Sequence, residues 1–276
     1  MWFTEHDLGC YWGDMQGISR FNGAIQKRRE KYPFKQNKYE NVLDNLDEKG
    51  YYIIRDAIDK DKVEALTKEL DNLIESGNYI KRQNEFEIVV DSALLNTANG
   101  PALAFNDLLV DIASAYFKTI PMIGTVNLRK SFVTDSLEEG TLLFHCDKNS
   151  IKMIKFFFYL NDVDAGTGPH CYVEGSHKQK FHGWKNKYRW SHDEIENIYG
   201  KDRIKYLTGK VGDVIVANTA GFHRGVKCTE SERRMLTVNY VVHPEFWIQP
   251  SEKLDKDFYD QLPENKKPVA DLLVKE

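Results

Sequence analysis

The hydrophobic positions of this 276-residue chain follow two different periods. In the first half, apolar residues recur at spacings of three and four, as at Val63, Leu66 and Leu70, and this spacing is typical of amphipathic helices. From about Val126 onward the apolar runs are short, and turn residues separate them. The pattern therefore predicts a mainly β core with flanking helices.

The first half is predicted to alternate between helices and short strands. Gly50 and Gly77 follow periodic segments and are plausible helix C-caps. We expect, in chain order, a helix that ends at Gly50, a strand over 51–55, a helix from Asp59 or Asp61 to Gly77, a strand over 86–90 and a helix over 103–116.

The second half is predicted to form a β-sandwich or barrel. Glycine-containing turns separate six apolar runs. A polar stretch over 178–210, with a predicted helix over 191–199, interrupts them, and so long an insertion in a β domain is usually a lid or binding loop. The predicted strands cover 126–133, 141–146, 151–160, 170–173, 213–217 and 235–242.

Composition excludes several classes of protein. The chain is 41% hydrophobic and 29% charged, with a net charge of −4, so it carries no overall basic charge for nucleic acid. No stretch has the length and apolarity of a transmembrane helix, and the N-terminus lacks the pattern of a secretory signal. The four cysteines show no repeated spacing, so we expect a cytoplasmic protein without disulfides or a zinc ribbon.

We expect one main domain with two extensions. Residues 1–40 are predicted to be an arm that packs on the core, and residues 41–249 are predicted to form the β domain with its insertion. Residues 250–276 are predicted to be a helical extension that packs on the core or joins two copies in a homo-oligomer.

The strongest chemical signal is the pair His145 and Asp147. On an extended strand, side chains two residues apart point to the same face, so this pair can hold adjacent positions of one metal ion while Cys146 points away. The best third ligand is His223, which follows the predicted strand over 213–217. Two histidines and one carboxylate form the facial triad of non-haem Fe(II) oxygenases. Taken singly, each residue also fits a structural role.

Arg234 opens the predicted strand over 235–242. If the apolar even-numbered residues of this strand face inward, Arg234 faces inward too and Arg233 points outward. A buried guanidinium requires an anion, and its planar fork suits a carboxylate. The far carboxylate of 2-oxoglutarate chelated to iron would supply this anion. The alternative partner is a protein carboxylate such as Asp213 or Glu232.

Five separated elements occur in an order that resembles the phytanoyl-CoA dioxygenase family. They are His145-x-Asp147, the stretch from Asn161 through Gly168-Pro169-His170 to Gly175-Ser176-His177, the pair Gly212-Asp213, His223 and Arg234. The segment from Gly50 to Arg55 is also similar to that family's entry segment, and the likeness covers about residues 41–243.

The resemblance implies an α+β protein with a double-stranded β-helix, or jelly-roll, core. It implies that His145, Asp147 and His223 hold Fe(II), that Arg234 binds the distal carboxylate of 2-oxoglutarate, and that O₂ is the oxidant. The expected reaction is hydroxylation, or another oxidation, of a C–H bond in a small polar metabolite, with succinate and CO₂ as co-products. Related halogenases have a small residue in place of the Asp147 carboxylate, so its presence favours hydroxylation.

Three further residues are candidate cofactor contacts. Asn127 and Arg129 share one face of the strand where the family often places a polar cofactor contact; a polar outward face is the alternative. Lys155 interrupts an apolar strand, which indicates a cofactor contact or a snorkelling edge residue.

Substrate contacts are expected from His170 and from the insertion, where His182, Trp184 and Trp190 are the candidates. The insertion residues could instead anchor this segment on the jelly roll. In Gly175-Ser176-His177 we expect structural roles.

Two other functions fit the same fold. A jelly-roll metalloenzyme without 2-oxoglutarate would pair Arg234 with protein. A non-catalytic binding protein would be expected to lack one of the metal ligands, whereas all three are present.

Overall fold

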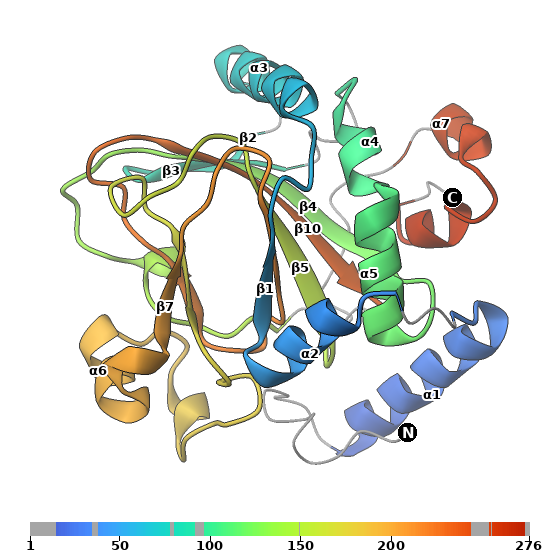
Figure 1. Ribbon diagram of the computed structural model, residues 1–276, viewed down its shortest axis with the longest axis horizontal. Coiled ribbons are helices and arrows are strands. Elements are labelled where there is room, and N and C mark those ends of the chain that lie inside the picture. Colours follow the sequence, from blue (N-terminus) through green and yellow to red (C-terminus); the bar gives the residue numbers. More distant parts are fainter. Residues whose placement is uncertain are drawn as a thin grey trace.

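The computed structural model describes residues 15–34, 38–77, 80–91, 97–148, 150–243, 254 and 256–273. Two antiparallel sheets face each other in its centre, and helices cover the outer face of the larger one (Figure 1). The strand order agrees with the predicted double-stranded β-helix, so the fold prediction is confirmed. In the described part of the chain, no helix has the length and apolarity needed to cross a membrane.

The larger sheet has seven strands. Its central strand, β10 (Arg233–Val241), pairs over most of its length with β4 (Met122–Ser131) on one side and with β5 (Met153–Tyr159) on the other. In spatial order the strands are β1 (Tyr51–Ile54), β8 (Val214–Ala217), β5 (Met153–Tyr159), β10 (Arg233–Val241), β4 (Met122–Ser131), β3 (Glu87–Asp91) and β2 (Ile80–Gln83).

The smaller sheet has three strands in the order β7 (Ile204–Leu207), β6 (His170–Val173) and β9 (His223–Gly225). The sequence pattern did not predict β2, β7 or β9 as strands. The predicted strand over 141–146 is wrong. A 3-10 helix, Gly140–Leu142, occupies its start because Gly140 adopts a φ of +54°, and only Phe144 and His145 then form single bridges.

The larger sheet is buried on both faces. Leu236, Val238 and Tyr240 of β10 belong to the core that the helices cover. The alternate residues Met235 and Thr237 face the space between the two sheets. Each fully buried leucine or valine contributes about 1.5–3 kcal/mol, so the more apolar face of β10 stabilises the helix-covered core and its more polar face remains for the interior.

The helices that cover this face are α2 (Glu40–Glu48), α3 (Lys60–Ser76), α4 (Gly100–Ala104) and α5 (Asp107–Phe117). Asp59 caps α3 by accepting a hydrogen bond from the Asp61 N–H, and Gly77 ends it in the left-handed conformation. The single helix predicted over 103–116 is two helices, because Asn106 leaves the helical conformation and caps α5.

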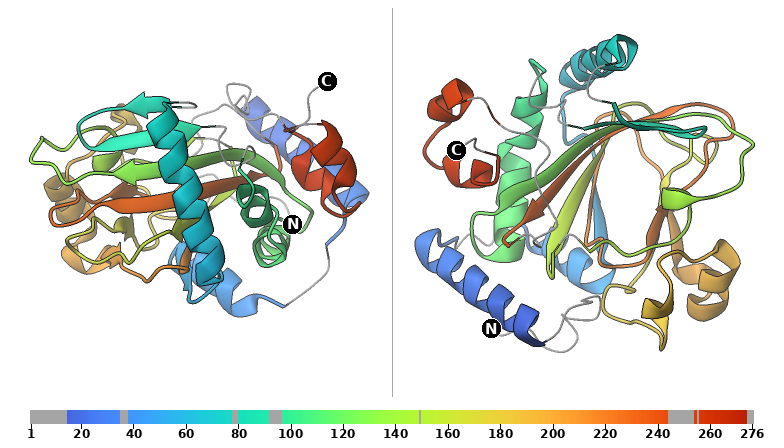
Figure 2. Two further views of the ribbon diagram at one scale, coloured as in Figure 1. Left: turned by 90° about the horizontal axis from the view of Figure 1, so that it is seen from above. Right: turned by 180° about the vertical axis from the view of Figure 1, so that it is seen from behind.

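The two ends of the described chain lie side by side (Figure 2). Helix α1 (Met15–Lys31) belongs to the predicted arm, and α7 (Lys256–Gln261) with the 3-10 helix Lys267–Ala270 belongs to the C-terminal segment. Arg28 joins them by donating from its terminal nitrogens to the Pro268 carbonyl at 2.6 Å and to Asp271 at 2.9 Å. The rest of the predicted arm and extension, residues 1–14, 35–37, 250–253, 255 and 274–276, lies outside the described residues.

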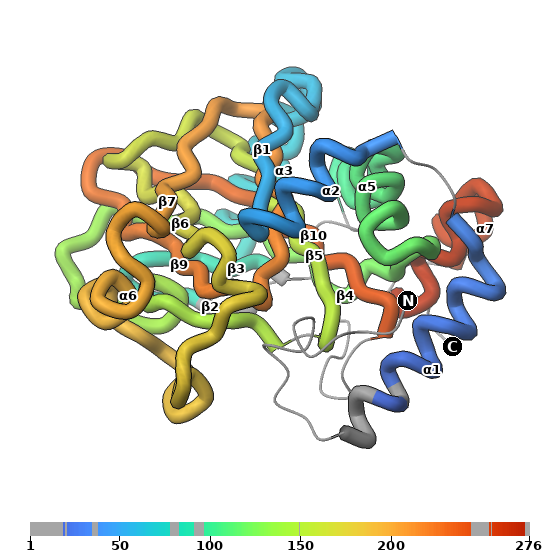
Figure 3. Tube along the Cα trace, turned by 60° about the horizontal axis from the view of Figure 1, so that its bottom comes forward, coloured from blue at the N-terminus to red at the C-terminus, as the bar shows by residue number. Residues whose placement is uncertain are grey.

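The insertion over 178–210 contributes strand β7 to the smaller sheet, and its other residues pack beside that sheet. It contains the 3-10 helices Trp184–Asn186 and Lys201–Arg203, and α6 (His192–Tyr199), which begins with a capping box between Ser191 and Glu194. It lies at the side of the molecule remote from α1 and α7 (Figure 3).

Candidate active site

A reciprocal pair of backbone hydrogen bonds aligns the two candidate histidines. The His145 N–H donates to the His223 carbonyl and the His223 N–H donates to the His145 carbonyl, both at 3.0 Å. The imidazole centroids are consequently 4.3 Å apart. The Asp147 N–H donates to the Thr219 carbonyl at 2.9 Å, which holds the carboxylate beside the same pair.

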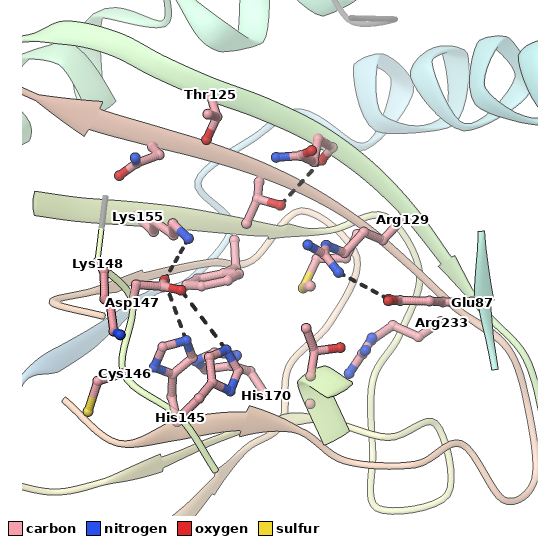
Figure 4. Close-up of a pocket in the computed structure, with 18 of the residues that line it drawn as sticks. Glu87, Thr125, Arg129, His145, Cys146, Asp147, Lys148, Lys155, His170 and Arg233 are labelled. Carbon is pink, nitrogen blue, oxygen red and sulfur yellow. Dashed lines mark hydrogen bonds and ion pairs between the residues drawn. The ribbon is translucent and has the colours of Figure 1, made fainter. Parts of the chain in front are cut away.

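The three predicted metal ligands meet at one point (Figure 4). Nε2 of His223 is 3.5 Å from one Asp147 oxygen, and Nε2 of His145 is 4.0 Å from the other. The three donor atoms all lie within 4.8 Å of one another, and the two histidines are buried. One ion could therefore contact all three, as the facial triad requires.

Backbone carbonyls set the orientation of both imidazoles. Nδ1 of His145 lies 2.9 Å from the Leu143 carbonyl oxygen, and Nδ1 of His223 lies 2.9 Å from that of Gly221. Because a carbonyl only accepts, each Nδ1 must carry the proton, and each Nε2 then directs its lone pair at the shared point.

The protonation states also suit a cation. Burial lowers the pKa of His145 and of His223, so both imidazoles are neutral near pH 7. Burial alone would raise the pKa of Asp147, but Lys155 and the two histidines outweigh it and hold that pKa well below the ordinary value. The site thus presents two neutral nitrogens and one carboxylate.

Lys155 positions the carboxylate of the candidate metal site. Its Nζ donates to an Asp147 oxygen at 2.6 Å. Loss of such an outer contact typically lowers metal affinity by about 10–100-fold, and we expect that effect for Lys155→Met, measured by anaerobic competition of Fe(II) with a chelator. Lys210→Met is the matched control, because Lys210 pairs with Asp162 on the surface. Unchanged Fe(II) affinity in Lys155→Met would contradict this role.

The three ligands open onto a cavity of about 270 Å³ between the two sheets. Four other predicted site residues line it, and they come from β4, β5 and β6. They are Asn127, Arg129, Lys155 and His170. The His170 ring lies 4.3 Å from that of Phe157 and 5.4 Å from that of His223, so it adjoins the metal ligands.

The predicted inward orientation of Arg234 is wrong. Its guanidinium lies on the helix side of the sheet, where it bonds Asp71 at 3.1 and 3.2 Å. The prediction assumed that the apolar residues of β10 face the active site, whereas they face the helices. Alternation then places Arg233, and not Arg234, in the cavity.

Arg233 is the functional candidate that the sequence prediction missed. It is 4% exposed and donates to the Gly168 carbonyl and, at 3.1 Å, to Ser131 Oγ. Its Nε has no hydrogen-bond partner among the described residues. The polar residues Thr237 and Asn239, which share its parity on β10, were the signal for this orientation.

A second guanidinium lies near Arg233 at the end of the cavity remote from the metal ligands (Figure 4). Arg129 donates to Glu87 at 3.0 Å, and Glu87 is 2% exposed. This ion pair neutralises Arg129 within the protein, so Arg233 is the better candidate for binding an added anion.

The candidate residues of the insertion lie elsewhere. His182 is exposed, and Trp184 and Trp190 pack with Phe222 in a separate apolar cluster. Both tryptophans border a small neighbouring cavity and do not line the main one. Their substrate roles stay predictions. The insertion instead contributes Tyr188 and Arg189 to the main cavity.

Gly175-Ser176-His177 makes structural contacts. Ser176 Oγ accepts from the Phe222 N–H at 2.7 Å, directly before His223, and a ring nitrogen of His177 lies 3.0 Å from the Asp47 carbonyl. This serine therefore helps to fix the strand that carries the second histidine.

His177 should make the stability of the metal-free protein depend on pH. Burial lowers its pKa from 6.5 to about 4. Because the unfolded chain takes up this proton first, the stabilisation is present above pH 6.5 and is lost as the pH falls toward 4, about 3 kcal/mol in all. We expect His177→Gln to flatten this part of the curve in denaturant titrations at several pH values. A curve as steep as that of the unmodified protein would contradict the assignment.

The fold and the site together define a jelly-roll protein with an internal His-Asp-His group that could hold a metal ion. The chain belongs to the phytanoyl-CoA dioxygenase (PhyH) family, whose model matches residues 46–235. Comparison with curated protein sequences gave no match.

Solved structures share the fold at low sequence identity. The non-heme alpha ketoglutarate-dependent carbocyclase SnoK from nogalamycin biosynthesis is 17% identical, with a TM-score of 0.58 over 75% of this chain and 86% of that one. The epimerase SnoN, solved with Fe³⁺, alpha ketoglutarate and nogalamycin RO, is 14% identical, with a TM-score of 0.60 over 73% and 82%. HygX from Streptomyces hygroscopicus, with nickel and 2-oxoglutarate bound, is 17% identical, with a TM-score of 0.58 over 80% and 92%.

Proposed function

We propose that this protein is an Fe(II)- and 2-oxoglutarate-dependent oxygenase that hydroxylates a C–H bond of a small polar molecule. The observation that carries the proposal is the convergence of His145, Asp147 and His223 at a cavity whose other end holds the buried Arg233. The family and the ligands of SnoN and HygX support it.

The residues present fit both cofactors. His145, Asp147 and His223 would hold Fe(II), and Arg233 would hold the distal carboxylate of 2-oxoglutarate through the Nε that has no protein partner among the described residues. Thr237 of β10 pairs with Phe157 of β5, and Arg233 lies four residues away from Thr237 on the same face of β10. Four residues of a strand span about 13 Å. Its side chain covers part of that distance, and a five-carbon keto diacid spans the rest.

Bound Fe(II) with 2-oxoglutarate and O₂ supplies the oxidising power for the C–H bond, and the protein supplies geometry and electrostatics. Lys155 keeps Asp147 ionised and fixes its rotation. The buried rings of Phe157 and His170 exclude water beside the metal ligands, and Arg233 orients the keto acid along the cavity. These residues therefore direct the oxidation at a substrate bound in the cavity beside the metal ligands.

An anaerobic titration tests the proposal. Addition of 2-oxoglutarate to the Fe(II)-loaded protein should produce a visible charge-transfer band, because that band requires chelation by the keto acid. Succinate release with a pool of small metabolites would then follow turnover. Absence of the band would overturn the use of 2-oxoglutarate and leave the alternative of a jelly-roll metalloenzyme that works without it.

Product analysis tests the reaction type. Hydroxylation places one atom of ¹⁸O₂ in the product, whereas an epimerisation or ring closure like those named for SnoN and SnoK leaves the product without it. A product without ¹⁸O would contradict hydroxylation while leaving the cofactor assignment intact.

A further inference from the structure

His170 has a ring nitrogen without a hydrogen-bond partner at the wall of the active-site cavity. The residue belongs to β6, lines the cavity and is 3% exposed. Its Nε2 is enclosed and has no partner among the described residues. Its Nδ1 is not enclosed, and it makes no hydrogen bond within the described part of the chain either. A buried polar group left without partners at a cavity wall indicates a ligand that completes it.

The His170 ring is neutral and has one N–H to donate. Burial lowers its pKa well below the ordinary value, and the neighbouring His223 and Arg233 lower this pKa further. A neutral imidazole carries a proton on one nitrogen and a lone pair on the other. Enclosed N–H groups without an acceptor are rarer in proteins than enclosed lone pairs. Nδ1 is therefore the nitrogen that carries the proton, and it is a donor on the cavity side.

The smaller sheet places His170 between His223 and Arg233. On β9, His223 and Gly225 are two residues apart and share one face. His170 pairs in register with Gly225, while Tyr172 pairs with His223. A Cβ on Gly225 would lie 3.3 Å from a terminal nitrogen of Arg233. In Figure 4, His170 lies beside the metal ligands and Arg233 lies at the other end of the cavity. His170 therefore flanks the path from the metal ligands to that guanidinium.

Gly225 leaves this path open. It lines the cavity, and a side chain there would press on the Arg233 guanidinium. One loop aligns the two donors that border the open space, because Arg233 donates to the carbonyl of Gly168, two residues before His170. A carboxylate has two oxygens that accept hydrogen bonds, so one that reaches Arg233 can also accept from His170.

We propose that His170 binds the distal carboxylate of 2-oxoglutarate together with Arg233, instead of contacting the substrate. Nδ1 of His170 donates to this carboxylate, which the Arg233 guanidinium also binds. The inference rests on the proposed function, because 2-oxoglutarate is the ligand that would extend from the metal ligands to Arg233. His170 thereby selects a keto acid with a second carboxylate, since an analogue without it leaves a buried donor unpaired.

Two keto acids of equal length test this assignment. 2-Oxoglutarate and 2-oxopentanoate share the groups that chelate a metal and differ only in the carboxylate at carbon 5. A hydrogen bond to a charged group corresponds to about 10–100-fold in affinity. His170→Leu should therefore weaken 2-oxoglutarate binding by that factor and leave 2-oxopentanoate binding unchanged or tighter. Anaerobic titration of the charge-transfer band of the Fe(II)-loaded protein measures both affinities.

The two keto acids also separate binding from a structural role. Equal weakening of both in His170→Leu would show that the ring only supports the site, and it would overturn the proposal. Unchanged 2-oxoglutarate affinity would overturn it as well, because a residue that contacts only the substrate gives that result. Because His170→Leu removes unpaired polar atoms, we expect the unfolding midpoint of the metal-free variant to be unchanged or higher, and a lower midpoint would contradict the assignment.

A conservative variant and a matched histidine complete the test. The amide nitrogen of His170→Asn lies one bond beyond Cγ, as Nδ1 does, so this variant should keep most of the affinity that His170→Leu loses. A loss as large as that of His170→Leu would overturn the role of Nδ1.

His192→Leu is the control for the loss of a histidine ring. His192 also has an unpartnered ring nitrogen among the described residues and a ring beside a phenylalanine, that of Phe144, but it does not line the cavity. It should bind both keto acids as the unmodified protein does. Absence of the charge-transfer band with 2-oxoglutarate in the unmodified protein would instead refute the proposed function, so the two failures are distinguishable.

Discussion

His223→Ala is expected to abolish 2-oxoglutarate turnover and to weaken Fe(II) binding by more than about a hundredfold. Outer contacts of a metal ligand are typically worth about 10–100-fold in affinity, and removal of the ligand itself should exceed that. The His223 imidazole supplies one of three donor atoms that lie within 4.8 Å of one another. Anaerobic Fe(II) titration and succinate release would measure the two effects.

Asp147→Asn is a better test of the carboxylate ligand than Asp147→Ala. Alanine would leave the largely buried Lys155 without its anion, and breaking a buried ion pair costs about 3–5 kcal/mol. Asparagine keeps an oxygen that accepts from Lys155 but removes the negative charge, so loss of Fe(II) affinity can be separated from loss of folding. We expect turnover at background in this variant.

His182→Ala is the matched control for both substitutions, because His182 is an exposed histidine of the insertion. It should bind Fe(II) as the unmodified protein does. Full succinate production in His223→Ala or Asp147→Asn would refute the ligand assignment, whatever the behaviour of the control.

The ligand triad was predictable because its geometry is local. A separation of two residues fixes the relative direction of His145 and Asp147 on any extended segment, even though the structure forms only single bridges there instead of a regular strand. His223 was found from its place after a buried strand. Its reciprocal backbone bonds to His145 depend on the meeting of distant segments, which no local pattern encodes.

The cavity wall was less predictable because the central strands are buried on both faces. Hydrophobic alternation identifies the inward face only when the other face meets water. In β10 both faces are covered, and the more apolar face meets the helices. The same rule explains why Lys155 interrupts an apolar strand without lying at an edge: β5 pairs with β10 and β8, and Lys155 faces the interior.

The variants Arg233→Gln and Arg234→Gln distinguish the two possible orientations of β10. They change adjacent residues, whose side chains point to opposite faces of the strand. Truncation of one partner of a buried charge pair costs about 2–5 kcal/mol, so Arg233→Gln should weaken 2-oxoglutarate binding by about 30–5,000-fold. Arg233→Lys should recover only part of the loss, since a lysine ammonium has no donor at the position of Nε and cannot also keep the two guanidinium bonds to Gly168 and Ser131. Titration of the charge-transfer band measures each affinity.

Arg234→Gln should leave 2-oxoglutarate binding unchanged. Its pair with Asp71 is partly exposed on the helix side, and exposed pairs contribute about 0–1 kcal/mol to stability. A small decrease in the unfolding midpoint is therefore the only expected effect. If Arg234→Gln weakened 2-oxoglutarate binding and Arg233→Gln did not, the register of β10 against β4 and β5 would be shifted by one residue. Such a shift would also move Asn239 out of the cavity wall.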